Sequence, residues 1–325
     1  MRVVGKHPDI PDAPRRALDI YARRYKASGE NTLEDIDLET MECEKNAEEI
    51  HAIELANIVT NRTLAHYGLP AFDIPTANVR IIKASEWPKF KRSSHAFFEQ
   101  TMETIFVEES ELPSMAYQIL NEIFHFKFYN ARQFTTGPSV QNRLYRNGLT
   151  VLSRDGKTRK LNAVNEALVE ELTIRYFPEI KRDALLGSRM VDSDKLIAQM
   201  QSDPRYSLRS SDTFDETYYV ESSEYPPEPG ALKTFGVWKY GYPKERKIFN
   251  ILVSKLYETN QKQFASRDGV FDMFAKAAFT GDMSRLLIVD ETFGQFTLRK
   301  IASLDKDLPA LERFIANLKS QEQKA

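Results

Sequence analysis

One long apolar segment, residues 113–131, does most to limit how this chain can fold. It begins with Pro113, and apolar or aromatic side chains then occupy most positions, including Ile119, Phe124 and Phe128. Proline is favoured in the first turn of a helix, and a helix that is apolar on nearly all sides has to be buried. We therefore predict that residues 113–131 form a central helix, around which the remaining elements pack.

The segments on either side of this helix predict a mixed α+β first half. Asp155-Gly156 between two β-type runs is a strong hairpin signal, and apolar periodicity separates the expected helices from the expected strands. The expected elements are a helix over 44–67, strands over 78–82 and 103–107, a hairpin over 144–161, and a helix over 162–177 that ends before Pro178.

The second half of the chain is predicted to be mainly helical. The expected helices cover 243–260, 269–280, 284–291 and 308–321. We divide the chain into a charged N-terminal appendage (1–45), an α+β domain (46–200), a polar linker or excursion (201–235) and a helical C-terminal lobe (236–325). The expected fold class is α+β, with a small mixed sheet packed on the buried helix and a helical second lobe.

Composition excludes several classes of partner. The 45 Lys and Arg residues and 47 Asp and Glu residues leave a net charge of −2, which gives no electrostatic reason to expect nucleic acid or a membrane surface. A single cysteine, Cys43, excludes an intramolecular disulfide. The longest aliphatic run, residues 286–289, is far shorter than the roughly 20 residues that span a bilayer. We therefore expect a cytoplasmic protein.

Three polar side chains interrupt the apolar pattern of the central helix: Asn121, Glu122 and His125. At 100° per residue they fall within one arc of about 100°, so they lie on the same side of the helix. A carboxylate and an imidazole in a buried position need partners, because burial without a partner costs several kcal/mol. A metal ion is one kind of partner, and polar side chains of a second helix are the other.

The helix expected over 162–177 offers such partners. Glu166 and Glu170 are four residues apart and therefore share one face of that helix. Ala163 and Ala167 lie alongside them, and their small side chains allow another helix to approach closely. We therefore expect the two helices to meet at these residues.

Asn121-Glu122-Ile123-Phe124-His125 followed by Asn165-Glu166-Ala167-Leu168-Val169-Glu170 resembles the site of gluzincin metallopeptidases, the branch of the zincins that includes thermolysin. That family carries His-Glu-x-x-His on one helix and Asn-Glu-x-x-x-acid on a later helix, and a strand precedes the first helix. The resemblance covers about residues 78–177 and implies a zincin-like fold.

The resemblance also implies a role for each matching residue. Glu122 matches the general base that takes a proton from zinc-bound water, His125 the second zinc ligand, Glu166 the third, and Glu170 the outer acid that orients the first ligand. The first ligand of the family is a histidine, and this chain has Asn121 there. Catalytic zinc keeps three protein ligands, and an amide oxygen is a poor zinc donor beside an imidazole nitrogen. We therefore expect zinc or another divalent metal to bind weakly.

The resulting hypothesis is a metallopeptidase-like protein with a degenerate metal site, inactive or impaired as a hydrolase, that binds a peptide or protein in its cleft. The strand over 103–107 is expected to be the sheet edge along which an extended peptide pairs. Tyr240, Tyr242 and Arg246 are candidate oxyanion donors from the second lobe, and an aromatic packing corner explains them equally well.

Two alternatives use the same residues. In the first, the chain is an active metal-dependent peptidase in which Glu170 accepts a hydrogen bond from the Asn121 amide group. The Asn121 oxygen then joins His125 and Glu166 as a ligand, with Glu122 as the base. In the second, these side chains form a buried hydrogen-bonded network with a purely structural role.

A third alternative belongs to a different class. Glu48-x-x-His51 repeats the Glu-x-x-His spacing of Glu122 and His125, and di-iron carboxylate bundles take such a motif from two helices. This reading requires Glu48 and His51 to face Glu122 and His125 across the core of a helical bundle. A mixed sheet packed on the central helix would contradict it.

Overall fold

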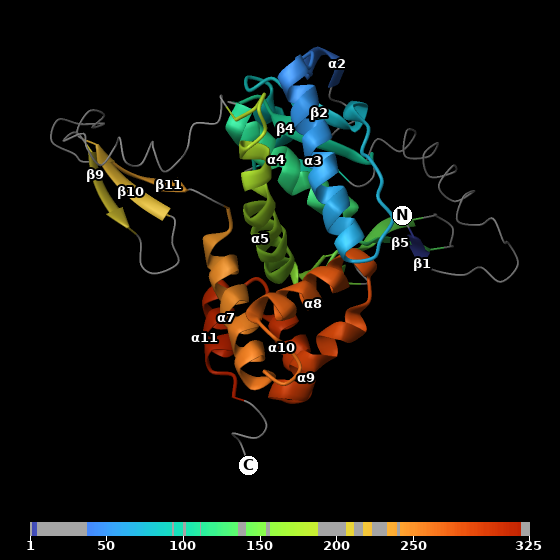
Figure 1. The fold of residues 1–325 in the computed structure, drawn as a ribbon, viewed down its shortest axis with the longest axis vertical. Helices are drawn as coiled ribbons and strands as arrows, with labels where there is room; N and C mark the ends of the chain where they lie inside the picture. Colours follow the sequence, from blue (N-terminus) through green and yellow to red (C-terminus); the bar gives the residue numbers. More distant parts are fainter. Residues whose placement is uncertain are drawn as a thin grey trace, which may run out of the picture.

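The computed structural model describes residues 2–4, 38–92, 94–99, 102–110, 112–135, 141–153, 157–187, 206–210, 217–222, 233–238 and 241–319. These residues form an α+β fold in which small sheets accompany a helical C-terminal region (Figure 1). The predicted fold class is therefore confirmed.

A mixed three-stranded sheet lies against the central helix. Strand β4 (Thr104–Glu108) is the middle strand, parallel to β2 (Val79–Ile82) and antiparallel to β3 (Ala96–Glu99). Alternate side chains of β4 enter different clusters, because successive residues of a strand point to opposite faces. Ile105 and Val107 join the main core, whereas Phe106 packs in a second cluster with Trp87, Phe90 and Phe97.

The expectation that the strand over 103–107 forms the sheet edge is wrong. Strand β4 is hydrogen-bonded on both sides, and the two edge strands are β2, within the predicted strand 78–82, and β3, which was not predicted. Strand β3 contains only four residues, Ala-Phe-Phe-Glu, and follows a polar stretch. Such a short run gives too little alternation for a strand to be recognised.

The central helix α4 (Leu112–Lys127) is confirmed, but it ends four residues before the predicted residue 131. The side-chain amide nitrogen Nδ2 of Asn130 donates to the backbone carbonyl oxygens of Phe126 at 3.1 Å and Phe128 at 2.9 Å. These bonds satisfy carbonyl groups that would otherwise lack partners at the end of the helix. Asn130 then begins strand β5 (Asn130–Thr135).

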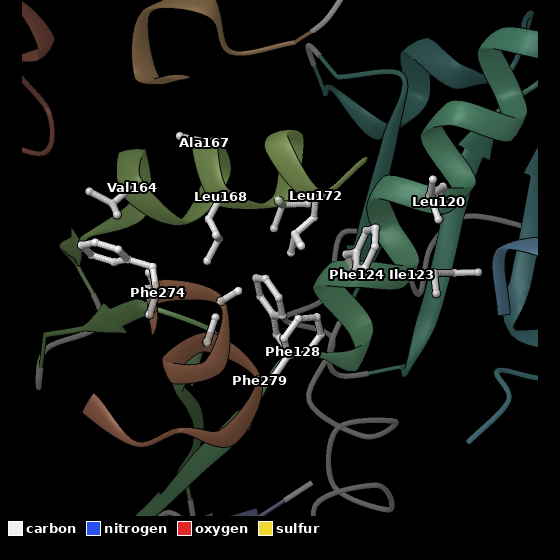
Figure 2. Packing of buried hydrophobic residues seen from close by; sticks show 14 of the residues in the cluster. Leu120, Ile123, Phe124, Phe128, Val164, Ala167, Leu168, Leu172, Phe274 and Phe279 are labelled. Carbon is white, nitrogen blue, oxygen red and sulfur yellow. The ribbon is translucent and has the colours of Figure 1, made fainter. Parts of the chain in front are cut away.

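Helix α5 (Asn162–Lys181) packs across α4 and against α8 (Arg267–Thr280). Figure 2 shows Leu168 and Leu172 of α5 pointing toward Phe128 and Phe279, whose ring centroids lie 4.7 Å apart. The expectation that α5 ends before Pro178 is wrong, because the helix continues to Lys181 with this proline inside it. A proline near the last turn removes one backbone hydrogen bond, and burial of Phe177 and Ile180 holds the helix together there.

A second sheet contains the predicted hairpin. Its strand order is β1-β5-β6-β7-β8, and β7 pairs antiparallel with β8 as expected. The expected strand over 144–153 is divided, however, because Gly148 and Leu149 form a turn between β6 and β7. The strands not yet given are β1 (Arg2–Val4), β6 (Gln141–Asn147), β7 (Thr150–Leu152) and β8 (Arg159–Lys160).

The buried guanidinium group of Arg146 joins this sheet to the C-terminal helices. Its Nε donates to the carbonyl oxygen of Gly148 at 2.7 Å, and its terminal nitrogens donate to the carbonyl oxygens of Gly281 at 2.7 Å and Ala277 at 3.3 Å. The last two carbonyls belong to the C-terminal end of α8, where a cation is favoured by the helix dipole. The two halves of the chain are therefore tied together by a charged contact as well as by the core.

The remaining elements follow the predicted order with a few differences. The helix expected over 308–321 ends at Ala316, α10 was not predicted, and residues 201–238 contain an antiparallel sheet that lies to one side of the helices in Figure 1. These elements are α2 (Leu38–Met41), α3 (Ala47–His66), η1 (Thr76–Asn78), η2 (Trp87–Phe90), β9 (Tyr206–Ser210), β10 (Thr217–Ser222), β11 (Lys233–Trp238), α7 (Pro243–Thr259), η3 (Met283–Leu287), α9 (Ile288–Phe293), α10 (Thr297–Ser303) and α11 (Leu308–Ala316).

The N-terminal segment 1–45 lies largely outside the described residues. Its last part packs on the body of the protein, since Met41 is 2% exposed and belongs to the cluster that contains Phe106. None of the helices in the described ranges has the length and apolarity needed to cross a bilayer.

Candidate functional site

The predicted meeting of α4 and α5 brings His125 and Glu166 into contact. The Nε2 atom of His125 lies 3.4 Å from Oε2 of Glu166, and the two side chains are only 13% and 16% exposed. Glu122 lies one turn earlier on α4 and interacts with both groups. Because an imidazole and two carboxylates share a poorly solvated space, their protonation states depend strongly on one another.

The pKa values of the pair favour an ion pair. Burial by itself would lower the pKa of His125, but the carboxylates of Glu166, Glu122 and Glu170 raise it to about 9. Burial also disfavours the charged form of Glu166, yet the His125 imidazolium and a hydrogen bond from Tyr242 hold the pKa of Glu166 below its usual value. His125 is therefore protonated and Glu166 ionised at neutral pH.

Glu122 is held in a different state. Burial raises the pKa of this carboxyl group to about 7, and Glu166 adds to the rise, although His125 opposes it. Its carboxylate accepts a hydrogen bond from the backbone N–H of Phe98 in the edge strand β3. Glu122 therefore connects the helix to the open edge of the sheet and has a pKa suited to proton transfer near neutral pH.

Asn121 turns its amide nitrogen toward α5. The Nδ2 atom donates to Oε2 of Glu170 at 3.0 Å and to Oγ1 of Thr173 at 3.2 Å. The Thr173 hydroxyl itself donates to the carbonyl oxygen of Val169 at 2.9 Å, so it acts as an acceptor toward Asn121. Because both partners accept, the nitrogen and oxygen of the Asn121 amide cannot be exchanged.

Glu170 is the centre of this network. It is 2% exposed, and it accepts hydrogen bonds from the Tyr117 hydroxyl and the Gly241 backbone N–H in addition to Asn121. Burial raises the pKa of Glu170, although these donors and Arg246 oppose the rise. The hydrogen bond between Glu170 and Asn121 anticipated from the sequence is thus present.

The three candidate oxyanion donors have different positions. Tyr242 lies at the site and donates to Glu166, whose negative charge raises the pKa of the phenol. Its backbone φ is 50°, a left-handed conformation that is rare for a residue with a side chain. Arg246 instead pairs with Glu171, with Nε 3.0 Å from Oε1, and it lines neither of the cavities at the site. Tyr240 lies outside the described residues.

Two adjoining cavities flank Glu122. The Asn147 cavity, of about 260 Å³, is lined by Glu122, His125, Asn147, Thr150 and Glu166 among others. The Tyr117 cavity, of about 500 Å³, is lined by Tyr117, Gln118, Asn121, Glu170 and Gly241 among others. Ala96 of strand β3, Glu122 and Tyr242 line both, so the two cavities form one cleft beside the edge strand.

Backbone groups of β3 face this cleft. Glu108 donates its N–H to the carbonyl oxygen of His95 at 2.8 Å, which makes these two residues a hydrogen-bonded pair. Hydrogen-bonded and open positions alternate along an antiparallel pair, so the backbone groups of Ala96 and Phe98 point away from β4. Of these edge groups, the N–H of Phe98 is bound by Glu122.

Several lining residues were not predicted, namely those of β3 together with Asn147 and Thr150. Asn147 and Thr150 are opposite each other at the ends of β6 and β7, across the turn Gly148-Leu149. The signal for this turn was present in the sequence, because glycine at the first of two loop positions favours a type II′ hairpin. The φ of Gly148 is 54°, as such a turn requires.

The donor set at the predicted metal position is incomplete. His125 and Glu166 are good zinc donors, and the third position holds the neutral amide of Asn121. Within the described ranges, no group of three or more His, Cys, Asp or Glu side chains is arranged to hold a metal ion. These residues therefore do not fit a catalytic zinc, which needs three protein ligands.

The geometry required for a di-iron bundle is not observed. His51 pairs with Asp183, with Nε2 3.0 Å from Oδ1, instead of facing His125. A mixed sheet packs on α4, whereas the bundle needs helices there.

No protein-family model, curated protein or solved structure matches this chain. Its function therefore has to be inferred from the site itself.

Proposed function

We propose that this chain is a metallopeptidase-like protein of the gluzincin type that has lost its metal site and binds a peptide or protein segment without hydrolysing it. The observation that carries the proposal is the state of Asn121. Its amide nitrogen is bound to Glu170 and Thr173, at the position where the family has its first zinc ligand. An amide in this place keeps the second helix attached but supplies no strong donor.

The contact between His125 and Glu166 is compatible with the same proposal. A protonated His125 beside an ionised Glu166 occupies the place of two ligands, and each neutralises the charge of the other. With a neutral amide at Asn121, the site would hold only weakly a Lewis acid that lowers the pKa of a water molecule, which is the main contribution of zinc to peptide hydrolysis. Glu122 remains able to accept a proton, but a base alone supplies only part of such a rate enhancement.

The edge strand supports binding of an extended peptide. The cleft runs beside β3, and the backbone groups of Ala96 and the carbonyl of Phe98 face it. A peptide that adds to a sheet edge gains affinity from main-chain hydrogen bonds and selectivity from pockets for alternate side chains. The Asn147 cavity and the Tyr117 cavity, both lined by Ala96 of β3, would serve as such pockets.

Metal analysis combined with peptide binding tests the proposal. The chain is purified without chelators, its zinc content is measured, and binding of random hexapeptide pools is followed by fluorescence anisotropy. We expect substoichiometric zinc, no hydrolysis of the pools, and saturable binding. The variant Ala96→Pro tests the role of the sheet edge. It removes an edge N–H and introduces a ring at the edge, so it should weaken peptide binding.

Two results would contradict the proposal. Stoichiometric zinc together with hydrolysis that is lost in Glu122→Gln would show an active peptidase that uses Asn121 as a ligand. Absence of peptide binding, with a folded protein, would leave the network around Glu170 with a structural role alone.

A further inference from the structure

Two residues that line the Asn147 cavity each carry a buried polar atom with no hydrogen-bond partner among the described residues. These atoms are Oδ1 of Asn147 and Oγ1 of Thr150, and each of the two residues is only 5% exposed. The two residues pair across the β6–β7 turn, so their side chains lie on the same face of the sheet. Both line the cavity that contains Glu122, His125 and Glu166.

The Asn147 oxygen is a fixed acceptor. Its amide nitrogen donates to Oδ1 of Asn130 at 2.8 Å and to the carbonyl oxygen of His125 at 3.4 Å. Asn130 in turn donates through its own nitrogen to Phe126 and Phe128, so its oxygen has to accept. An amide flip is therefore excluded, and whatever meets Asn147 from the cavity has to donate a hydrogen.

The Thr150 hydroxyl supplies the complementary group. A hydroxyl donates one hydrogen and accepts others, so beside the fixed acceptor of Asn147 it can donate to an oxygen of the same ligand. A primary carboxamide presents an N–H donor and a carbonyl acceptor side by side. Leaving buried polar atoms without partners costs about 1–3 kcal/mol each, which gives such a ligand an advantage over an apolar one.

The charge of the cavity favours a neutral ligand. Three basic residues and three acidic residues line it. The basic ones are Arg92, His125 and Arg159, and the acidic ones are Glu99, Glu122 and Glu166. Basic and acidic side chains both line the cavity, so a ligand with a full charge of either sign meets like charges as well as opposite ones. A volume of about 260 Å³ is below that of a typical drug-sized site and suits one side chain.

We propose that the Asn147 cavity is a specificity pocket for the primary carboxamide of a glutamine or asparagine side chain in the bound peptide. The N–H group donates to Asn147, and the carbonyl oxygen accepts from Thr150. This inference rests on the proposed function, because it assigns the pocket to a residue of the peptide that pairs with β3.

The test uses four hexapeptide pools that hold Gln, Met, Glu or Lys at one fixed position and random residues elsewhere. Methionine is close to glutamine in size but lacks both polar groups. We expect the Gln pool to bind the full-length chain about tenfold more tightly than the Met pool, in line with one or two buried hydrogen bonds. The Glu and Lys pools should bind more weakly than the Gln pool.

The variant Thr150→Val separates recognition from stability. Its side chain has the same shape, and the hydroxyl it removes bonds to nothing in the described residues, so thermal stability should not fall. The Gln preference should drop to less than about threefold. Thr63→Val, on α3 and outside the cavity, is the matched control and should leave the preference unchanged.

Each other outcome overturns the inference. Equal binding of the Gln and Met pools, tighter binding of the Glu or Lys pool, or a Gln preference that survives Thr150→Val would show that the pocket does not read a carboxamide. Binding of peptides without a Gln preference would sink this inference alone. Absence of binding by every pool would also remove the proposed function.

Discussion

The Nε2 atom of His125 and Oε2 of Glu166 lie 3.4 Å apart, as two ligands of one tetrahedral zinc ion would. Two metal bonds of about 2.1 Å at the tetrahedral angle place their donor atoms about 3.4 Å from one another. This spacing is compatible with the proposed gluzincin-type site, in which Asn121 is the position that lacks a strong zinc donor.

Asn121→His should therefore restore zinc binding. A second imidazole supplies the third ligand and completes a set of two histidines and one glutamate, the kind of set that holds catalytic zinc. We expect the variant to bind zinc at least about 100-fold more tightly than the natural chain, because changes in the outer shell alone cost 10–100-fold. Zinc content after purification and calorimetric titration measure the gain.

The double variant Asn121→His, His125→Ala is the control for this experiment. It contains the new histidine but lacks one of the original donors, so it should bind zinc as weakly as the natural chain. Equal zinc affinity in the single and double variants would mean that the metal binds elsewhere, and the assignment of His125 as a ligand position would be wrong.

Glu166→Gln should lower the pKa of His125 from about 9 by roughly 1–3 units, since an opposite charge in contact shifts a pKa by that amount. The pKa of His125 in the folded state lies above the usual 6.5, so the stabilisation by the ion pair is complete below pH 6.5 as long as Glu166 is ionised, and it is lost as pH rises through 9. Titration of the imidazole resonances by NMR measures the shift. An unchanged His125 pKa in the variant would rule out the ion pair.

Glu122→Gln should make the protein more stable than the natural chain at pH 8 but not at pH 4. The pKa of Glu122 is raised from 4.5 to about 7 on folding, so ionisation of this group destabilises the fold as pH rises between those values. At about 1.4 kcal/mol per unit, the gain of the variant approaches about 3 kcal/mol above pH 7. Urea unfolding at both pH values tests it, and a gain independent of pH would contradict the assigned ionisation.

The sequence was sufficient to predict the two helices of the site. A segment as apolar as that around Phe124 has no stable place except the core, and the four-residue spacing of Glu166 and Glu170 holds for any helix. The contact between Asn121 and Glu170 was also predictable in kind, because a buried carboxylate and a buried amide on facing helices need each other.

The positions of the cleft-lining residues of β3 and of Asn147 and Thr150 could not be predicted from the local sequence pattern alone. Strand β3 has four residues, and its place at the edge depends on pairing with β4, which is a tertiary interaction. Gly148 signals a turn, but the position of Thr150 opposite Asn147 depends on the register in which β6 and β7 pair. A displacement of the turn by one residue would have turned both side chains away from the cavity.

Gly148→Ala should destabilise the protein by about 3 kcal/mol or more, because a Cβ atom there would lie 2.4 Å from Oδ1 of Asn165 and 2.4 Å from Cδ2 of Phe128. The left-handed backbone adds about 1–2 kcal/mol. Gly68→Ala is the matched control, since its φ is 74° but nothing lies within 4 Å of the added atom, so it should cost only the backbone term. Chemical denaturation measures the free energy of unfolding of both variants. Equal losses of stability would show that the turn is not packed tightly against Asn165 and Phe128.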